Sequence, residues 1–298
     1  MRANRALQEN IARLEVVVFD IDGVLIDTAN SYPQAICNAI RHYRNLKELS
    51  IEDVTYEEVI QFKKFPGFNN DWDIAEGLLL YKVAKHAGLV GNLTNFLEEA
   101  GKEGDGVKGI RALLSRIKSF NDKWPNRKLV RQLAMEHYAG RKYCSRLYGF
   151  KPRYFFYDGT IENEKVILDK TLWEQLPEKK AILTGRNRNE TMLALSRLGI
   201  NGSVACVVYD GKAGYRKPSP ELLKVILEET NSTYLVFAGD SYDDYLTASN
   251  FSQKYGLKQV HFVQILRKGT NPFKEEISFA ENVNDFISYL IEQRGRTK

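Results

Sequence analysis

The sequence lacks any apolar run of about 18 residues, the length that a membrane-spanning helix needs. This absence excludes such a helix. The first residues also lack the order of a secretory signal, because Arg2, Arg5, Glu9 and Arg13 stand before any long apolar stretch. We therefore expect a cytoplasmic protein with no membrane among its partners.

Cysteine, histidine and proline are scarce. The 3 cysteines, Cys37, Cys144 and Cys206, lie far apart without C-x-x-C spacing, which argues against a zinc site and gives no disulfide framework. The 4 histidines show no ligand spacing. The remaining composition, 43% hydrophobic and 27% charged over 298 residues, is that of a globular protein with one large domain or two ordinary ones.

The charge of the chain is modest, because 43 lysines and arginines stand against 38 aspartates and glutamates, for a net charge of +5. Such a balance does not by itself indicate nucleic acid, and we expect none as a partner. It is compatible with a small anionic substrate. The oligomeric state stays open.

Short apolar runs typical of buried parallel strands recur along the chain. The first is Leu-Glu-Val-Val-Val-Phe at 14–19, and similar runs follow at 180–183, 205–209, 234–238 and 259–263. Helical patterns lie between the later runs, near 189–198, 219–229 and 242–250. Ser219 and Pro220 suit the N-cap and the first position of one of these helices. The alternation predicts an α/β fold with a doubly wound parallel sheet.

The segment from Asn30 to Lys151 differs, because it shows amphipathic helical patterns and few strand-like runs. Residues 104–109 spell G-x-G-x-x-G, but no strand precedes them. We interpret them as a turn that begins a helix, not as a dinucleotide site. We expect residues 29–154 to form an all-helical cap domain, inserted into a core made of residues 1–28 and 155–298.

Polar side chains follow four of the predicted strands, where ligands of open α/β sheets gather. They are Asp20 and Asp22, then Thr184-Gly185-Arg186, then Asp210 with Lys217-Pro218, and finally Gly239-Asp240-Ser241 through Asp244. The carboxylates would repel one another in a partly dry pocket unless a divalent cation lay among them. Oxygen ligands without nearby histidine or cysteine favour Mg²⁺.

Such a site suits phosphoryl transfer. A metal ion together with Lys217 would admit an anionic phosphate, and a carboxylate can attack phosphorus to form an aspartyl-phosphate. A second carboxylate two residues further on can protonate the leaving oxygen and later activate water.

These motifs resemble those of the haloacid dehalogenase superfamily of phosphohydrolases, in the branch with a helical cap between the first and second motifs. The resemblance rests on Asp20 to Leu25, Thr184, Lys217-Pro218 and Gly239 to Asp244, in that order. It implies a Rossmann-like core and a Mg²⁺-dependent phosphatase. It further implies that Asp20 is the nucleophile and Asp22 the general acid and base, that Thr184, Gly185 and Lys217 bind the substrate phosphate, and that Asp20, the backbone carbonyl of Asp22, Asp240 and Asp244 hold the metal.

Two features of the motifs leave alternatives open. Asp243 stands beside Asp244, and we prefer Asp244 for the metal because it follows Asp240 by one helical turn. The insert is longer than the compact cap of the commonest small phosphatases, so its residues cannot be aligned by spacing.

We expect substrate specificity from Arg186 at the sheet rim and from the segment 62–72, which combines aromatic, amide and lysine side chains around a Pro-Gly turn. The candidates in this segment are Lys63, Lys64, Asn69 and Trp72. A surface loop with its aromatics turned inward is the competing interpretation. The alternatives for function are a phosphomutase of sugar phosphates and a non-catalytic module that binds a phosphorylated metabolite. The identity of that metabolite is not encoded in the motifs.

Overall fold

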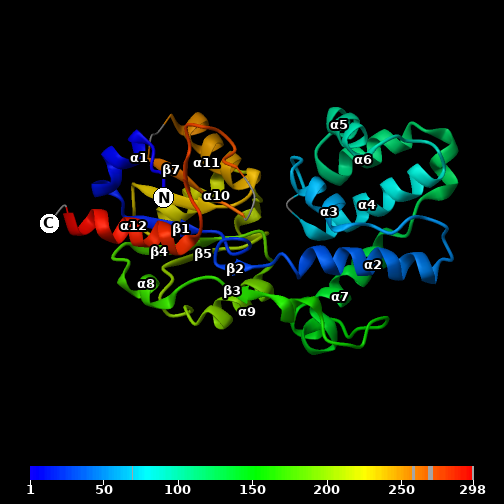
Figure 1. Cartoon of the computed structure of the whole chain (residues 1–298), viewed down its shortest axis with the longest axis horizontal. Coiled ribbons are helices and arrows are strands. Elements are labelled where there is room, and N and C mark those ends of the chain that lie inside the picture. Colours follow the sequence, from blue (N-terminus) through cyan, green and yellow to red (C-terminus); the bar gives the residue numbers. More distant parts are fainter. Residues whose placement is uncertain (69, 257–258, 268–270, 297–298) are drawn as a thin grey trace. The chain divides into compact units, whose positions relative to one another are not determined.

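The computed structural model describes residues 1–68, 70–256, 259–267 and 271–296. The chain divides into two compact units, shown in Figure 1. We term Met1–Asp27 with Lys165–Lys298 the core unit, and Thr28–Glu164 the helical unit. Within the described part of the chain, no helix combines the length and the apolar character needed to cross a membrane.

The core unit is built around a parallel sheet of six strands in the order β5-β4-β1-β6-β7-β8. The strands are β1 (Val16–Phe19), β4 (Lys179–Leu183), β5 (Cys206–Val208), β6 (Leu235–Gly239), β7 (Val260–Ile265) and β8 (Ser278–Ala280). β1 pairs with β4 on one side and with β6 on the other. The order of the strands therefore reverses at β1, and such a switch point leaves a crevice at the carboxyl ends of the strands. The α/β fold expected from the sequence is confirmed.

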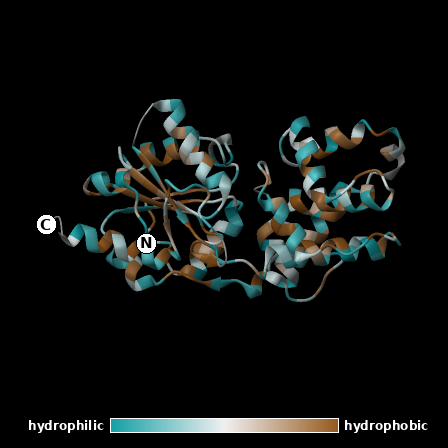
Figure 2. Cartoon of the chain, turned by 45° about the horizontal axis from the view of Figure 1, so that its top comes forward, coloured by the Kyte–Doolittle hydropathy of each residue, from teal (hydrophilic) through white to brown (hydrophobic). Residues whose placement is uncertain are grey.

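Helices cover both faces of this sheet (Figure 1). One face carries α1 (Arg5–Asn10), α8 (Lys170–Gln175), α9 (Arg188–Leu198) and α12 (Val283–Arg296), and the other carries α10 (Glu221–Glu229) and α11 (Tyr242–Tyr255). Side chains of β1 alternate between the faces, Val17 and Phe19 toward the first and Val16 and Val18 toward the second. All four are fully buried, and Figure 2 shows the strands as strongly hydrophobic. The apolar run of β1 is thus explained by burial on both sides.

Short elements complete the core unit. An antiparallel ribbon of β2 (Ile26–Asp27) and β3 (Lys165–Val166) lies where the chain leaves the core unit and where it returns. Short 3₁₀ helices occur in both units, at Ile11–Arg13, Lys118–Lys123, Thr160–Asn163 and Lys212–Gly214.

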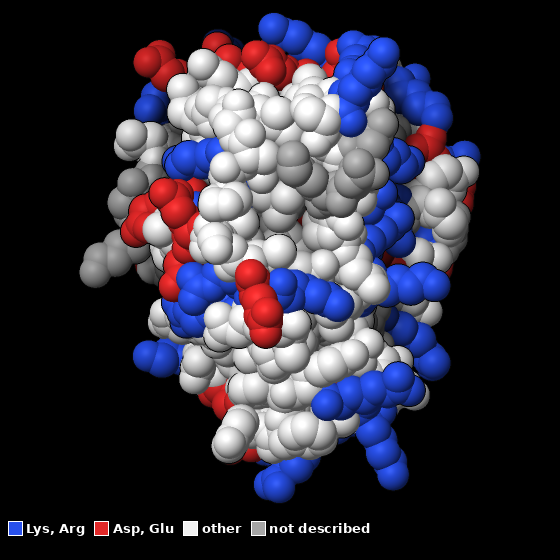
Figure 3. Space-filling view, turned by 90° about the vertical axis from the view of Figure 1, so that its right-hand side faces the viewer, with Lys and Arg blue, Asp and Glu red and all other residues white. Residues whose placement is uncertain are grey.

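The helical unit consists of α2 (Tyr32–Leu46), α3 (Tyr56–Lys63), α4 (Asp71–His86), α5 (Leu93–Glu103), α6 (Gly106–Ser115) and α7 (Arg127–Tyr148). Gly104 and Asp105 of the G-x-G-x-x-G sequence separate α5 from α6, and the rest of the sequence forms the start of α6, as expected. Gly106 has φ +55°, and an added Cβ there would lie 2.3 Å from the carbonyl oxygen of Gly67. On the face drawn in Figure 3, Lys and Arg side chains outnumber Asp and Glu.

The boundary of the helical unit differs from the sequence-based expectation. Thr28 and residues 155–164, which we assigned to the core, belong to the helical unit. The backbone N–H groups of residues 153, 154 and 155 donate to the buried carboxylate of Glu136 on α7, at 3.0, 2.7 and 3.0 Å. Further along, Glu164 accepts a hydrogen bond from the Tyr138 hydroxyl at 2.8 Å. These contacts with α7 attach the segment to the helices.

Candidate active site

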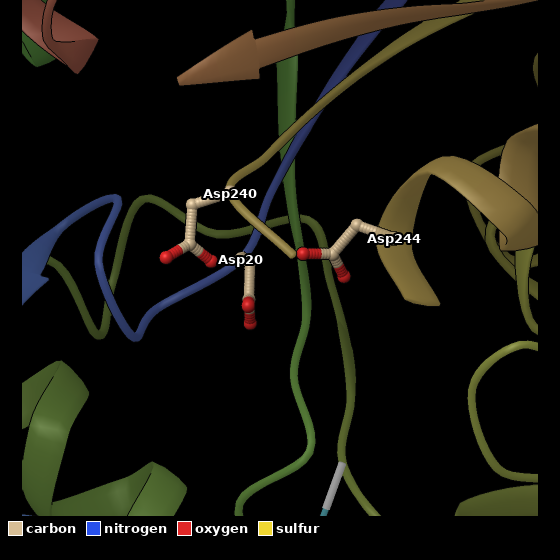
Figure 4. Close-up of side chains that lie close together, drawn as sticks. All are labelled: Asp20, Asp240 and Asp244. Carbon is tan, nitrogen blue, oxygen red and sulfur yellow. The ribbon is translucent and has the colours of Figure 1, made fainter. Parts of the chain in front are cut away.

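An acidic cluster forms where β1 and β6 end. Asp20 directly follows β1, and its N–H donates to the carbonyl of Ala238 on β6 at 3.0 Å. Asp240 directly follows β6, and Asp244 lies in the first turn of α11. The three carboxylates converge in Figure 4, and each offers an oxygen within 4.8 Å of the others. The carboxylates thus gather where the neighbouring strands β1 and β6 end.

The composition of this cluster fits a hard divalent cation. All three aspartates are buried, and desolvation raises the pKa of Asp20 well above its ordinary value, although Lys217 counteracts it. Desolvation also raises the pKa of Asp240. Buried oxygen donors that repel one another are the ligands that Mg²⁺ satisfies. Asp20, Asp240 and Asp244 are therefore the residues that would hold the metal.

The cluster includes one of two neighbouring aspartates. Among the described residues it contains Asp244 and not Asp243, in line with our preference. Asp244 is fixed by a capping box, because its Oδ2 accepts from the N–H of Ser241 at 3.0 Å and from the Ser241 hydroxyl at 2.7 Å. The contribution of the backbone carbonyl of Asp22 to the metal stays a prediction.

Lys217 is the cation inside the cluster. Its Nζ lies 3.2 Å from Oδ1 of Asp20 and 2.5 Å from Oδ1 of Asp244, and its side chain is 2% exposed. Burial opposes the positive charge, but the two carboxylates outweigh this effect and hold the pKa of Lys217 above its ordinary value. The ammonium group therefore stays charged between the two carboxylates.

Thr184 and Gly185 follow β4, the neighbour of β1. The N–H of Thr184 donates to the carbonyl of Val208 at 2.9 Å, and its hydroxyl accepts from the N–H of Arg186 at 3.3 Å. Thr184 is buried. Because β1 and β4 are parallel neighbours, Thr184 stands at the same edge of the sheet as Asp20. Its contact with a phosphoryl oxygen stays a prediction.

Asp22 and Arg186 form an ion pair in the core unit. Nε and Nη2 of Arg186 both donate to Oδ1 of Asp22, at 2.9 and 2.6 Å. The Arg186 side chain is 1% exposed. We expected Arg186 to face the substrate, and the structure places its guanidinium against the carboxylate of the candidate acid and base. Its contribution to specificity stays a prediction.

One charged residue of the site was missed in the sequence. Arg267 contacts Oδ2 of Asp240 through its Nε. It comes just after β7, at the same edge of the sheet as the other strand-end residues. The strand-end rule that identified Asp20 and Asp240 could have found it, because the apolar run at 259–263 was recognised as a strand.

The specificity candidates of the segment 62–72 lie in the helical unit. Lys63 pairs with Asp71 at 2.7 Å, and Lys64 is exposed. Trp72 is buried, with its ring centroid 5.8 Å from that of Tyr32 and 5.7 Å from that of Tyr138. Asn69 lies outside the described residues. The burial of Trp72 favours the inward-facing interpretation for this side chain, and the contact of the segment with a substrate stays a prediction.

The sequence matches the family model of the haloacid dehalogenase-like hydrolases over residues 14–251. The chain belongs to this family of hydrolases, which confirms the resemblance stated above. No curated protein sequence matches the chain.

Solved structures with the same fold cover nearly the whole chain. Phosphatase Tt82 from Thermococcus thioreducens is 23% identical, covers 93% of this chain and 99% of its own, and gives a TM-score of 0.65. A predicted phosphoglycolate phosphatase from Haemophilus somnus is 13% identical, and the match covers 93% of this chain and 98% of that protein with a TM-score of 0.56. A protein assigned as a β-phosphoglucomutase from Thermotoga maritima is 16% identical, and the match covers 94% of this chain and 99% of that protein with a TM-score of 0.50. At these identities the likeness establishes the fold.

Proposed function

We propose that the protein is a Mg²⁺-dependent phosphomonoesterase that hydrolyses a small phosphorylated metabolite through an aspartyl-phosphate on Asp20. The observation that carries this proposal is the position of Asp20. It lies buried after the central strand, within 4.8 Å of two further carboxylates and 3.2 Å from Lys217. A carboxylate in this setting can attack phosphorus while neighbouring positive charge balances the incoming phosphate.

The contacts of Asp20 indicate which oxygen attacks. Its Oδ1 accepts from the N–H of Ile21 at 2.8 Å and lies near Lys217. We therefore assign Oδ2 as the nucleophile. Oδ2 forms the new bond to phosphorus as the bond to the ester oxygen breaks, and the leaving oxygen takes both electrons of that bond. Lys217 stays protonated and stabilises the charge on the transferring phosphoryl group.

Asp22 supplies the proton that the leaving oxygen needs. The same carboxylate then removes a proton from water, which attacks the aspartyl-phosphate and releases inorganic phosphate with Asp20 restored. Because Arg186 holds Oδ1 of Asp22, we assign the proton transfers to Oδ2. Arg186 is then a positioning residue that fixes the carboxyl group.

A bound Mg²⁺ would be held by Asp20, Asp240 and Asp244 and would neutralise charge on the phosphoryl oxygens. The helical unit is proposed as the cap that recognises the leaving group, with Lys63 and Lys64 as candidate contacts and Arg186 at the rim. The motifs of the core recognise only the phosphoryl group, so selectivity among metabolites requires contacts beyond it.

Phosphate release from a panel of phosphorylated metabolites, with Mg²⁺ and with EDTA, tests this function. We expect release that needs Mg²⁺ and that disappears in Asp20→Asn. The matched control is Asp285→Asn, which changes an exposed aspartate on α12. Undiminished hydrolysis by Asp20→Asn would overturn the proposal, and conversion of a sugar phosphate to its isomer without release would favour a phosphomutase.

A further inference from the structure

Among the described residues, the three cations that contact the candidate site are each paired with an aspartate. Lys217 contacts Asp20 and Asp244, Arg186 contacts Asp22, and Arg267 contacts Asp240. Four carboxylates and three cations in their ordinary charge states leave one net negative charge. The charge on Arg267 thus influences how strongly the cluster attracts ions of either sign.

Arg267 differs from the other two cations in its exposure. The side chains of Lys217 and Arg186 are 2% and 1% exposed, whereas that of Arg267 is 39% exposed. Its partner Asp240 is buried, and Oδ2 of Asp240 is also covered by Gly23, where an added Cβ would lie 2.0 Å away. Figure 4 shows one oxygen of Asp240 turned toward Asp20 and the other pointing away. Arg267 therefore holds a ligand carboxylate from the solvent edge of the cluster.

We propose that Arg267 is a further phosphate-recognising residue of the reaction, and that its charge determines how the affinity of this site for the metal ion compares with its affinity for phosphate. By neutralising Asp240 it weakens the attraction of the cluster for a divalent cation. Its partly exposed positive charge strengthens the attraction for the anionic substrate. This inference rests on the proposed function.

The sign of the effect separates this role from others. Removal of a positive charge favours a bound cation and disfavours a bound anion. A residue that only orients Asp240 would give weaker cation binding when it is replaced. Replacement of a residue needed only for folding would weaken the binding of both the cation and the anion.

The test compares the full-length protein with Arg267→Gln and Arg267→Lys at one fixed ionic strength. Isothermal titration calorimetry measures the Kd of Mg²⁺ on metal-free protein and the Kd of inorganic phosphate on Mg²⁺-saturated protein. We expect Arg267→Gln to bind Mg²⁺ about fivefold to tenfold more tightly and phosphate about fivefold to tenfold more weakly. Arg267→Lys keeps the charge and should stay near wild type in both. Arg5→Gln, at an exposed arginine paired with Glu9, should change neither Kd.

Weaker Mg²⁺ binding by Arg267→Gln, or unchanged Kd values for both ligands, would overturn the role of Arg267 and leave the proposed function standing. A wild-type protein that binds neither Mg²⁺ nor phosphate would overturn the proposed function itself. Arg267→Met is measured in parallel in case Arg267→Gln does not fold. Both differences from wild type should shrink as KCl is raised, because salt screens a partly exposed charge, and differences that persist in salt would contradict a charge effect.

Discussion

The Nζ of Lys217 lies 2.5 Å from Oδ1 of Asp244, while the other oxygen of Asp244 accepts from Ser241 and caps α11. A single buried carboxylate thus connects the ammonium group of the site with the start of the helix that follows β6. Removal of Asp244 would take a partner from both Lys217 and Ser241, although Lys217 would keep its contact with Asp20.

Lys217→Met should abolish activity and lower the free energy of unfolding of the metal-free protein by about 3 to 5 kcal/mol, the usual cost of leaving a buried charge unpaired. The cause is that Asp20 and Asp244 lose the cation between them. Mg²⁺ should restore part of the stability. Urea unfolding in EDTA and in Mg²⁺ measures both effects. Lys254→Met, which breaks an exposed pair with Glu221, should have far less effect, and equal losses would contradict this account.

Ser241→Ala should lower the free energy of unfolding by about 1 kcal/mol, because it removes the N-cap of α11. It should also weaken Mg²⁺ binding, since Asp244 loses a hydrogen bond that fixes it. Ser219→Ala is the matched control. From the sequence we expected Ser219 to be the N-cap of α10. This helix instead begins at Glu221 with Pro220 at the N-cap position, and no side chain forms a capping hydrogen bond there. Thermal unfolding and Mg²⁺ titration distinguish the two, and equal effects would show that the cap is not the cause.

Acid should destabilise the helical unit through His137. Burial lowers its pKa to about 4, and His42, whose Nδ1 lies 3.1 Å from Nε2 of His137, adds to the effect. In the unfolded chain the pKa returns to about 6.5, so the unfolded state binds a proton that the folded state does not. As pH falls from about 6.5 to about 4, stability should fall by up to about 3 kcal/mol.

Urea unfolding at a series of pH values between 7 and 4 checks the contribution of His137. His137→Gln should lose less stability over this range than the wild type, because residue 137 no longer gains a proton on unfolding. His86→Gln replaces an exposed histidine and should keep the wild-type pH dependence. If His137→Gln and the wild type lose stability in parallel, the acid sensitivity has another source.

Lys64 gives a clean test of the segment 62–72, because it is exposed whereas Lys63 is paired with Asp71. Lys64→Ala should leave the unfolding temperature unchanged. If the segment recognises the leaving group, the variant should lower kcat/KM for the best metabolite of the panel and spare a small aryl phosphate, since only the former offers binding energy beyond the phosphoryl group. Lys108→Ala, at an exposed lysine of α6, is the control. Equal losses on both substrates would contradict this role.

The strand-end residues were predictable from the sequence because they depend on local pattern and on one rule of parallel sheets. Asp20 follows a run that is apolar because both faces of β1 are covered, and Asp240 follows β6 for the same reason. Arg267 was missed because the apolar run was ended at residue 263, whereas β7 continues to Ile265 and brings Arg267 to the rim. The pairing of Arg186 with Asp22 depends on side-chain directions that spacing does not encode.

The boundary of the helical unit was not predictable in the same way. The attachment of residues 153–155 to the helical unit depends on the Glu136 carboxylate of α7. A buried carboxylate that accepts backbone N–H groups from a distant segment leaves no periodic signal. The sequence also left open whether the aromatic side chains near the Pro-Gly turn face inward. In the structure Phe62, Phe68 and Trp72 are buried.

The central position of β1 has a consequence for the order in which the chain folds during synthesis. Val16 pairs with Lys179 on one side and with Leu235 on the other, so both neighbours of β1 leave the ribosome long after it does. The helical unit is one continuous stretch of sequence, Thr28–Glu164, and its synthesis is complete earlier. β1 therefore stays unpaired until β4 and β6 have been synthesised, and the pairing of strands that lie far apart in the sequence is slow. A nascent chain that stops before β6 carries Asp20 but no acidic cluster, and the exposed edges of its unpaired strands need protection from aggregation until synthesis ends.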